Sequence, residues 1–352
     1  MRRVEVAPLV GVRVLEVPTP MPGEGEVLVN TSLVGICGSD THALAGGHPF
    51  LNATYFAGHE VVGRVAIGAA VTGLPLGQRV ILKPSVACGL CGNCLAQRSN
   101  ACESLSWIGC DPSKTLAGGM ADSFVAPARN LYPISDSVDD ETAALIECLA
   151  TPVHAARIAG DLAGARVVII GAGTIGVLSL VAAKRAGASS VVMTDLDDSK
   201  LARAKRLGAT AAVRANAVEL VDAVTAALGG KADVVFDCVA NEHSIAQAVG
   251  LLRRAGTLLL VGVPPKAASV PLPYVQDWEL RVQGCAAYTE ADIQTAIEIA
   301  SDGGIPSGEI INSILDLADV VEAFTVASMD SSGKVLLRCG RRAKDATVAT
   351  RA

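Results

Sequence analysis

Apolar runs of strand length alternate with helical stretches between about residues 165 and 285. Ala165–Ile170 is a β-branched run typical of a buried strand, and the Ala-rich stretch Val177–Ala186, of helical length, follows it. Three further runs have the strand pattern: Ser190–Thr194, Ala232–Asp237 and Thr257–Val261. A helix is predicted at His243–Arg254. Strands that alternate with helices predict a parallel sheet with helices on both faces, a doubly wound α/β fold.

The first 150 residues have a different pattern, in which short apolar runs are separated by Pro and Gly. These runs are Glu26–Asn30, Val61–Val65, Gln78–Leu82, Ser123–Ala126 and Asn130–Ile134. They predict an irregular, β-rich domain. Beyond about residue 287 we expect helices at Asp292–Ser301 and Asp319–Ala327. A last strand at Gly333–Arg338 is expected to rejoin the first domain.

Composition limits the classes of function. The chain is 51% hydrophobic and 18% charged, a composition that excludes a disordered chain. Its 352 residues are enough for two domains. With 29 Lys and Arg against 35 Asp and Glu, the net charge of −6 argues against nucleic-acid binding. The longest apolar runs are far shorter than the roughly 20 residues that span a bilayer, and no signal peptide is evident. We therefore expect a soluble, cytoplasmic protein with neither a nucleic-acid nor a membrane partner.

Four of the ten cysteines lie close together, with the spacing C-x2-C-x2-C-x7-C. They are Cys88, Cys91, Cys94 and Cys102. Four thiolates at this spacing can close a tetrahedral shell around Zn²⁺, and a closed shell indicates a structural site. An iron–sulfur cluster is the alternative, although its usual runs space the fourth cysteine differently. Among the remaining cysteines, Cys110, Cys238, Cys285 and Cys339 are expected to be buried thiols.

Two other segments contain metal-ligand residue types. Gly35–His42 includes Cys37 and Asp40, and Gly58–Glu60 includes His59. Cys37 and His59 are typical zinc ligands, Glu60 is a further ligand or a neighbour, and Asp40 is suited to orienting the His59 ring. Spacing alone does not exclude ordinary buried roles for these residues, nor does it link them to Glu147.

A glycine-rich turn joins the strand that ends at Ile170 to the helix that follows. It reads Gly171-Ala-Gly173-Thr174-Ile175-Gly176, and Asp195 ends the next strand. This is G-x-G-x-x-G in the context of a dinucleotide-binding fold. The glycines allow a pyrophosphate to approach the helix N-terminus, and Asp195 can accept hydrogen bonds from the ribose hydroxyls of NAD. NAD is therefore expected in preference to NADP, whose 2′-phosphate would meet a like charge.

Further coenzyme contacts follow from the same fold. Lys200 is expected beside the adenosine ribose, whereas Arg203 is expected on a solvated helix face. Val239, Val261 and Val263 follow strand ends, where the nicotinamide would lie.

In their order along the chain, these motifs resemble the zinc-dependent medium-chain alcohol dehydrogenases, over essentially the whole of Glu26–Arg338. The resemblance implies a GroES-like catalytic domain at 1–148 and 287–352, with a structural zinc lobe at about 84–105. It implies a Rossmann domain at 149–286. It also implies two zinc ions per chain, one catalytic and one structural.

The resemblance assigns a role to each site residue. Cys37, His59 and Glu147 are implied as ligands of the catalytic zinc, with Glu60 as a mobile ligand. Ser39 and His42 match the family's proton relay, and Asp40 matches the acid that lies behind the metal ligands. The implied reaction transfers a hydride from a zinc-bound alkoxide to NAD, or in the reverse direction.

Glutamate at position 147 is typical of the polyol and threonine dehydrogenase branches, although that polyol branch usually has Pro where this chain has Cys148. A secondary alcohol or polyol is therefore the expected substrate. L-threonine oxidation and, from a different class, a non-catalytic dinucleotide-binding protein are the alternatives. A homodimer or homotetramer is expected, joined at a sheet edge formed by Leu258–Val263 and Val270–Pro273.

Overall fold

The computed structural model describes residues 1–68, 73–329 and 333–340, and the chain divides into two compact units. Unit 1 consists of Met1–Arg98, Cys102–Glu147 and Ile311–Ala352. Unit 2 consists of Cys148–Ile310 together with the short piece Ser99–Ala101. Unit 1 is therefore discontinuous in sequence, and most of unit 2 comes between its second segment and its third.

Unit 2 is built on a six-stranded sheet in which all neighbouring strands are parallel. Its strands are β11 (Arg166–Ile170), β12 (Ser190–Asp195), β13 (Ala211–Arg214), β14 (Ala232–Asp237), β15 (Leu252–Leu260) and β16 (Arg281–Gly284). They lie in the order β13-β12-β11-β14-β15-β16, which is the order of dinucleotide-binding sheets. The doubly wound α/β prediction is confirmed.

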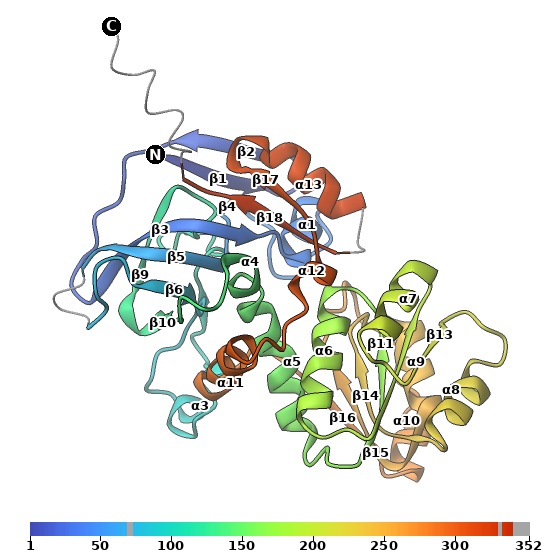
Figure 1. Cartoon of the computed structure of the whole chain (residues 1–352). Helices are drawn as coiled ribbons and strands as arrows, with labels where there is room; N and C mark the ends of the chain where they lie inside the picture. Colours follow the sequence, from blue (N-terminus) through green and yellow to red (C-terminus); the bar gives the residue numbers. More distant parts are fainter. Residues whose placement is uncertain (69–72, 330–332, 341–352) are drawn as a thin grey trace, which may run out of the picture. The chain divides into compact units, whose positions relative to one another are not determined.

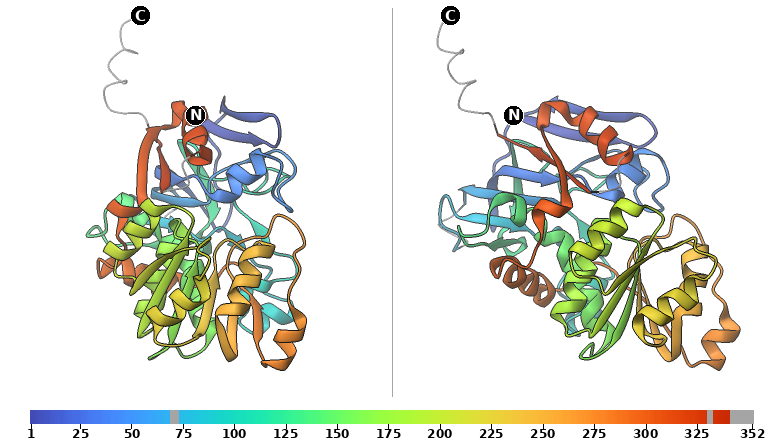
Figure 2. Two further views of the ribbon diagram at one scale, coloured as in Figure 1. Left: turned by 90° about the vertical axis from the view of Figure 1, so that its right-hand side faces the viewer. Right: turned by 45° about the vertical axis from the view of Figure 1, so that its right-hand side comes forward.

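Helices lie on both sides of this sheet (Figures 1 and 2). The α-helices between residues 146 and 310 are α5 (Ile146–Ala159), α6 (Thr174–Arg185), α7 (Asp198–Arg206), α8 (Leu220–Leu228), α9 (Glu242–Leu251), α10 (Leu272–Asp277), α11 (Glu290–Ser301) and α12 (Ser307–Ile310). Because side chains alternate along a strand, Val168 and Ile170 of β11 face α8 and α9 within one apolar core. The sheet is thus covered by apolar side chains, as its β-branched sequence predicts.

Three expectations for this region differ from the structure. The helix predicted at His243–Arg254 ends at Leu251, because the backbone becomes extended at Leu252 and begins β15. Leu258–Val263 is not the sheet edge, because β16 pairs with β15 and is itself the outer strand. The division expected after residue 286 falls after Ile310, since Asp292 of α11 binds His154 and Arg157 of α5.

Unit 1 is rich in short strands, as its interrupted pattern predicts. The strands are β1 (Arg2–Ala7), β2 (Gly11–Glu16), β3 (Glu26–Gly35), β4 (Tyr55–Phe56), β5 (Glu60–Ile67), β6 (Arg79–Leu82), β7 (Ser85–Val86), β8 (Ser106–Trp107), β9 (Ser123–Pro127), β10 (Leu131–Pro133), β17 (Ile311–Asp316) and β18 (Lys334–Arg338). The largest sheet has the order β10-β6-β5-β3-β18-β17, with β9 also paired to β3. Among the residues that the structure describes, the unit's α-helices are α1 (Gly38–Leu44), α3 (Gly92–Leu95), α4 (Asp140–Ala143) and α13 (Val320–Met329).

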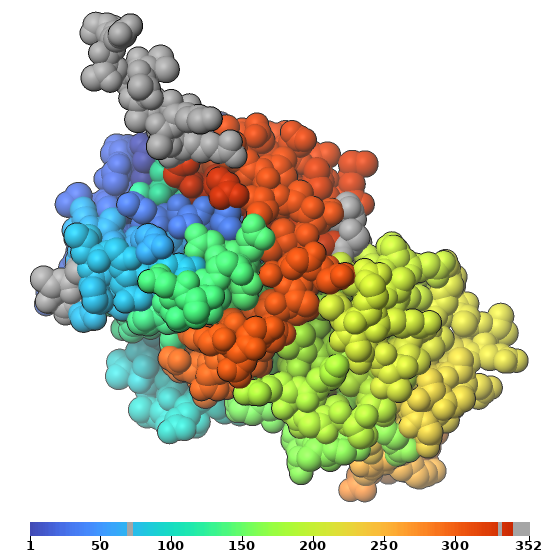
Figure 3. Space-filling model, viewed as in Figure 1, coloured from blue at the N-terminus to red at the C-terminus, as the bar shows by residue number. Residues whose placement is uncertain are grey.

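The C-terminal segment completes unit 1. β18 pairs antiparallel with β3, so that Leu336 lies opposite Gly35, and α13 packs against β2. Figure 3 shows this orange to red segment against the blue N-terminal strands. The strand expected at Gly333–Arg338 is therefore β18, and it does rejoin the first part of the chain.

Over the residues that the structure describes, no helix combines the length and apolar character needed to cross a membrane.

Candidate metal centres and coenzyme site

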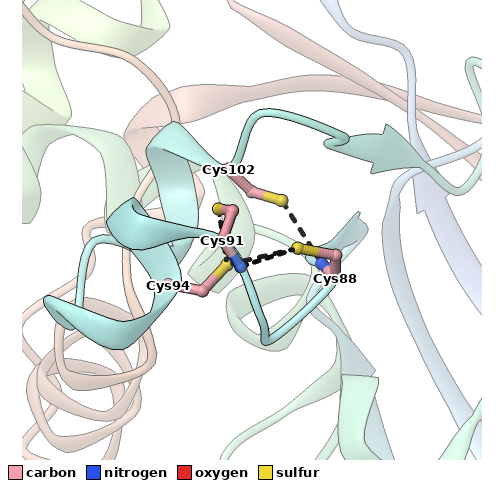
Figure 4. A group of neighbouring side chains, drawn as sticks. All are labelled: Cys88, Cys91, Cys94 and Cys102. Carbon is pink, nitrogen blue, oxygen red and sulfur yellow. Dashed lines mark hydrogen bonds between the residues drawn. The ribbon is translucent and has the colours of Figure 1, made fainter.

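The four clustered cysteines converge in space, as their spacing predicts. Their sulfur atoms all lie within 4.8 Å of one another (Figure 4). The Cys88–Cys94 and Cys91–Cys94 sulfur distances are 3.9 and 3.5 Å. A tetrahedral zinc site with Zn–S bonds of about 2.3 Å has sulfur atoms about 3.8 Å apart. The cluster therefore fits a single zinc ion with no open position.

Backbone N–H groups point at these sulfur atoms. Leu90 and Cys91 donate to Cys88 Sγ at 3.4 Å, and Ser104 donates to Cys102 Sγ at 3.4 Å. Chiefly through the backbone N–H of Glu103, the pKa of Cys91 is lowered to about 6. N–H donors favour thiolates over thiols, and thiolates are the form that binds metal.

A second group of ligands lies within unit 1, where β3 and β5 place them. Cys37 follows β3, His59 precedes β5, and Glu60 begins β5 opposite Gly35. Ligand atoms of Cys37, His59 and Glu60 lie within 4.8 Å of one another, and His59 and Glu60 are buried. The thiol, imidazole and carboxylate are a donor set that zinc binds. The residues present therefore fit a zinc ion.

Glu147 lies beside Glu60 of this group. Its carboxylate lies within 4.8 Å of the Glu60 carboxylate, but it does not belong to the group that contains Cys37 and His59. Cys148, which follows it in α5, is buried and belongs to unit 2. The assignment of Glu147 as the third ligand remains a prediction.

Helix α1 holds the residues of the predicted relay. Asp40 is fully buried, and its carboxylate accepts hydrogen bonds from Tyr55 Oη at 2.9 Å and from the Cys37 N–H at 3.2 Å. Burial raises the pKa of Asp40. Ser39 is half-buried and His42 is exposed. The accessibility of His42 is compatible with proton exchange with solvent, but the relay itself stays a prediction.

Lys334 was not anticipated from the sequence. Its Nζ lies 2.7 and 2.8 Å from the two carboxylate oxygens of Glu60 and 3.2 Å from the Ile36 carbonyl. Both charged side chains are buried. Gly35 leaves room for this pair, because a Cβ there would overlap Glu60 Oε2. No local pattern reveals Lys334, since β18 meets β3 only through long-range pairing.

Cys110 differs from the buried thiol that the sequence predicts. It is half-buried, and its sulfur lies 3.6 Å from Nδ1 of His59. Burial by itself lowers the pKa of His59, but the Cys110 and Cys37 sulfurs raise it well above its ordinary value.

In unit 2, the glycine-rich turn has the predicted form. Gly171 has a φ of +95°, and Gly173 caps α6, which begins at Thr174 and Ile175. A Cβ on Gly176 would overlap the Gly171 carbonyl, so glycine is required for this close contact. The turn thus presents the N-terminus of α6 beside the end of β11, where a pyrophosphate binds in such folds.

Asp195 ends β12 and holds the turn. Its Oδ2 accepts the Ala172 N–H at 2.7 Å, and its Oδ1 accepts the Asp197 N–H at 3.0 Å. A pocket of about 140 Å³ lies beside it. The pocket is lined by Ile170, Gly171, Thr194, Asp195, Leu196, Ala215, Val239, Asn241, His243, Ser244 and Gln247. The size and position of this pocket suit part of an adenosine group.

Arg203 lies elsewhere than expected. It is buried rather than solvated, its Nη2 donates to the Ala172 carbonyl at 2.7 Å, and its Nη1 donates to the Glu309 carbonyl at 3.2 Å. The side chain points into the protein because the carbonyls of Ala172, in the glycine-rich turn, and of Glu309 accept its hydrogen bonds. Lys200 is half-buried on the same helix.

The expected nicotinamide residues lie after β14 and β15. Asp237 fixes the first of these turns, since its Oδ1 accepts the Val239 N–H at 3.0 Å and its Oδ2 accepts the Ser244 hydroxyl at 2.7 Å. Val239 and Val263 are partly exposed, whereas Val261 is buried. Val239 and Val263 are thus accessible to a coenzyme at the strand ends.

Two family models match the chain. Residues 23–136 match the alcohol dehydrogenase GroES-like domain, and residues 174–302 match the zinc-binding dehydrogenase domain.

Similar proteins cover almost the full length. The chain is 32% identical to sorbitol dehydrogenase of Ovis aries over 328 residues, which is 92% of each chain. It is 31% identical to L-threonine 3-dehydrogenase of Stenotrophomonas maltophilia over 331 residues, covering 93% of this chain and 96% of the relative.

Solved structures resemble it as well. A zinc-binding dehydrogenase of Sinorhizobium meliloti bound to NADP superposes with a TM-score of 0.88 at 29% identity, covering 96% of this chain and 98% of the other. An alcohol dehydrogenase of Escherichia coli complexed with NADH has a TM-score of 0.87 at 27% identity, with coverages of 96% and 99%. Together with the metal-ligand groups and the parallel sheet, these similarities show that the chain belongs to the zinc-dependent medium-chain alcohol dehydrogenase family.

Proposed function

We propose that this protein is an NAD-dependent zinc enzyme that interconverts a secondary alcohol or polyol and the corresponding ketone. The observation that carries the proposal is the Cys37–His59–Glu60 donor group, in a chain that also has a dinucleotide-binding turn. A non-catalytic dinucleotide-binding protein would need the turn but not the metal ligands. Sorbitol dehydrogenase and D-xylulose reductase among the relatives favour a polyol.

A bound zinc ion lowers the pKa of a substrate hydroxyl, and NAD accepts the hydride from the carbon that carries it. Cys37, His59 and Glu147 would hold the zinc, and Glu60 would join or leave it. Ser39 would accept the hydroxyl proton, and the exposed His42 would pass it to solvent. Cys88, Cys91, Cys94 and Cys102 would hold a second, structural zinc.

Asp195 supports NAD as the coenzyme. Its carboxylate is fixed at the end of β12 by the Ala172 and Asp197 N–H groups, beside the pocket that suits adenosine. A 2′-phosphate there would meet this negative charge. Arg203 does not offset it for a phosphate, because its guanidinium is buried against backbone carbonyls. One similar structure carries NADP and another NADH, so the two coenzymes are compared directly in the assay below.

We further propose that the chain forms a homodimer or homotetramer through β16. This strand is the outer one of the parallel sheet, and an uncovered edge offers N–H and C=O groups for pairing with a second copy. Light scattering of the purified protein would give the expected two- or fourfold multiple of the 35.8 kDa chain mass. A monomeric mass would contradict the proposal.

The function is tested by NADH formation with zinc-loaded protein and a panel of polyols, cyclitols, secondary alcohols and L-threonine. NADP⁺ is assayed in parallel. We expect a polyol to be oxidised with NAD⁺. Cys37→Ser should lower kcat/KM at least about 1,000-fold, since metal stabilisation is worth several kcal/mol and about 1.4 kcal/mol changes a rate tenfold.

Cys339→Ser is the matched control, because Cys339 is a buried thiol of unit 1 outside the ligand groups described above. Turnover of L-threonine alone would favour the amino-alcohol alternative. Coenzyme binding without turnover of any substrate, in a protein that holds no metal at Cys37, would favour the non-catalytic alternative.

A further inference from the structure

Two glycines bring Cys110 against His59. Gly109 has a φ of +84°, and a Cβ on it would lie 2.6 Å from the Gly58 carbonyl oxygen. Gly58 has a φ of +109°, and a Cβ on it would overlap the backbone N of Met120. The backbones at Gly58 and Gly109 are therefore in contact. This contact places His59, which follows Gly58, beside Cys110, which follows Gly109.

The contact between the two side chains is specific. Cys110 Sγ lies 3.6 Å from Nδ1 of His59, and the Trp107 ring packs edge-on against the imidazole with centroids 6.4 Å apart. His59 is 4% exposed, so its ring is fixed among these neighbours. The sulfur thus faces a defined ring nitrogen.

Asp40, the acid expected to orient His59, is directed elsewhere. Although Asp40 lies within 4.8 Å of His59 and Cys110, its Oδ1 accepts the Tyr55 hydroxyl and its Oδ2 accepts the Cys37 N–H. The polar atom in hydrogen-bond contact with Nδ1 is the sulfur of Cys110.

A histidine that binds a metal through one ring nitrogen normally donates the N–H of the other to an acceptor, which fixes its tautomer and orientation. We propose that Cys110 is a positioning residue for the catalytic metal: its sulfur accepts the His59 Nδ1–H and leaves Nε2 to bind zinc. The inference rests on the proposed function, because it assumes a metal at Cys37 and His59.

The test compares Cys110→Ala, which has no acceptor, with Cys110→Ser, whose hydroxyl can accept the same hydrogen bond. Cys339→Ala removes another buried thiol of unit 1 as the matched control. Zinc is competed from each protein with a chromophoric chelator, and zinc held by the four cysteines reports whether the lobe remains folded. Cobalt is then substituted into the catalytic site, because thiolate-to-cobalt charge-transfer absorption reports the number of sulfur ligands.

We expect Cys110→Ala to weaken zinc affinity at the catalytic site about 10- to 100-fold, the usual cost of losing such a partner. Cys110→Ser should stay within about threefold of wild type, and the charge-transfer intensity should be unchanged in both. Unchanged affinity in Cys110→Ala would overturn the inference. Loss of charge-transfer intensity in both variants would overturn it too, because Cys110 would then itself be a ligand.

The inference and the proposed function fail in different ways. Wild-type protein that holds zinc only at the four cysteines would overturn the catalytic metal centre, and with it the inference. Wild-type protein with both sites filled, combined with a Cys110→Ala variant of unaltered affinity, would overturn the inference alone.

Discussion

At the scale of residues, the Cys37–His59–Glu60 group depends on the pairing of individual buried charges. Glu60 is surrounded by Cys37, His59 and Glu147, and its carboxylate is bound by the buried ammonium of Lys334. A buried carboxylate is tolerated because an opposite charge and hydrogen bonds compensate for its lost hydration. Lys334 therefore stabilises Glu60 in unit 1, whether or not Glu60 also contacts the metal.

Replacing Lys334 tests this compensation. We expect Lys334→Met to lower the free energy of unfolding by about 3 kcal/mol, because it removes the cation from a buried ion pair. The double variant Lys334→Met/Glu60→Gln should recover part of the loss, since both charges are then absent. Urea denaturation measures the free energy of unfolding of the single and the double variant.

The exposed pair Arg214–Asp198 provides the comparison. Arg214→Met should cost at most about 1 kcal/mol, because both side chains of that pair are largely in solvent. Equal losses from Lys334→Met and Arg214→Met would contradict the assigned role of Lys334.

At the scale of elements, the glycine turn depends on α7 as well as on its own sequence. Both backbone polar groups of Ala172 are bound, the N–H by Asp195 and the carbonyl by Arg203. Arg203 also reaches the Glu309 carbonyl in α12. Residues of β12 and α7 thus fix the two peptide groups that flank the Ala172 α-carbon in the turn.

Removing the guanidinium should affect coenzyme binding more than the chemical step. We expect Arg203→Met to raise KM for NAD about tenfold with a smaller change in kcat, since a charged hydrogen bond contributes roughly 1.5–3 kcal/mol. Arg206→Met is the control, because Arg206 is exposed on the same helix and its partner is the Glu309 carboxylate. An unchanged KM for NAD in Arg203→Met would exclude this role.

Helices α5 and α11 are joined by a buried carboxylate, that of Asp292, and the half-exposed guanidinium of Arg157. Asp292 is 1% exposed, and it binds His154 at 2.8 Å, Arg157 at 2.6 Å and the Thr289 N–H at 2.8 Å. Burial alone raises the pKa of Asp292, but Arg157 and the other donors outweigh it and hold the pKa far below its ordinary value. This pairing joins α11 to α5 within the second unit.

The lowered pKa predicts how stability depends on pH. Asp292 stabilises the fold fully above its unfolded-state pKa of about 3.9, and this contribution decreases as the pH falls toward the lower folded-state pKa. We expect Asp292→Asn to cost about 3 kcal/mol at pH 7 and roughly 1 kcal/mol less at about pH 3. Urea denaturation at both values measures this, and a loss that does not change with pH would contradict it.

At the scale of the whole molecule, the chain combines two metal-ligand groups and a coenzyme turn in separate parts of its sequence. The four-cysteine group is local, because all its ligands lie within fifteen residues and their backbone donors adjoin them. The Cys37–His59–Glu60 group instead depends on the pairing of β3 with β5. The two metal sites should therefore be separable by mutation.

Zinc analysis tests this separation. Cys102→Ser should reduce bound zinc from about two ions per chain to about one and lower the Tm, because a structural zinc site contributes directly to folding. The single variant Cys37→Ser should instead lose the zinc of the other site and keep the structural zinc. The control Cys339→Ser should retain both zinc ions. A single zinc in wild-type protein that disappears in Cys102→Ser would show that only the lobe binds metal.

The sequence by itself determined the features that are local. The β-branched runs determined the parallel strands, the glycine spacing determined the turn at the start of α6, and the cysteine spacing determined the structural metal group. The glycine turn and the cysteine group are each formed by residues close in the chain, so their spacing carries the geometry, and a β-branched run identifies a strand by its own residues although its partner strands lie far away in the sequence.

Only the tertiary structure decided the contacts between distant segments. Lys334 meets Glu60 because β18 pairs with β3, Cys110 meets His59 because two glycine backbones touch, and Arg203 turns inward to carbonyls of a distant loop. It also placed Glu147 beside Glu60 rather than in the Cys37–His59 group. Such contacts depend on long-range strand pairing and close backbone packing, which leave no periodic signal in the sequence.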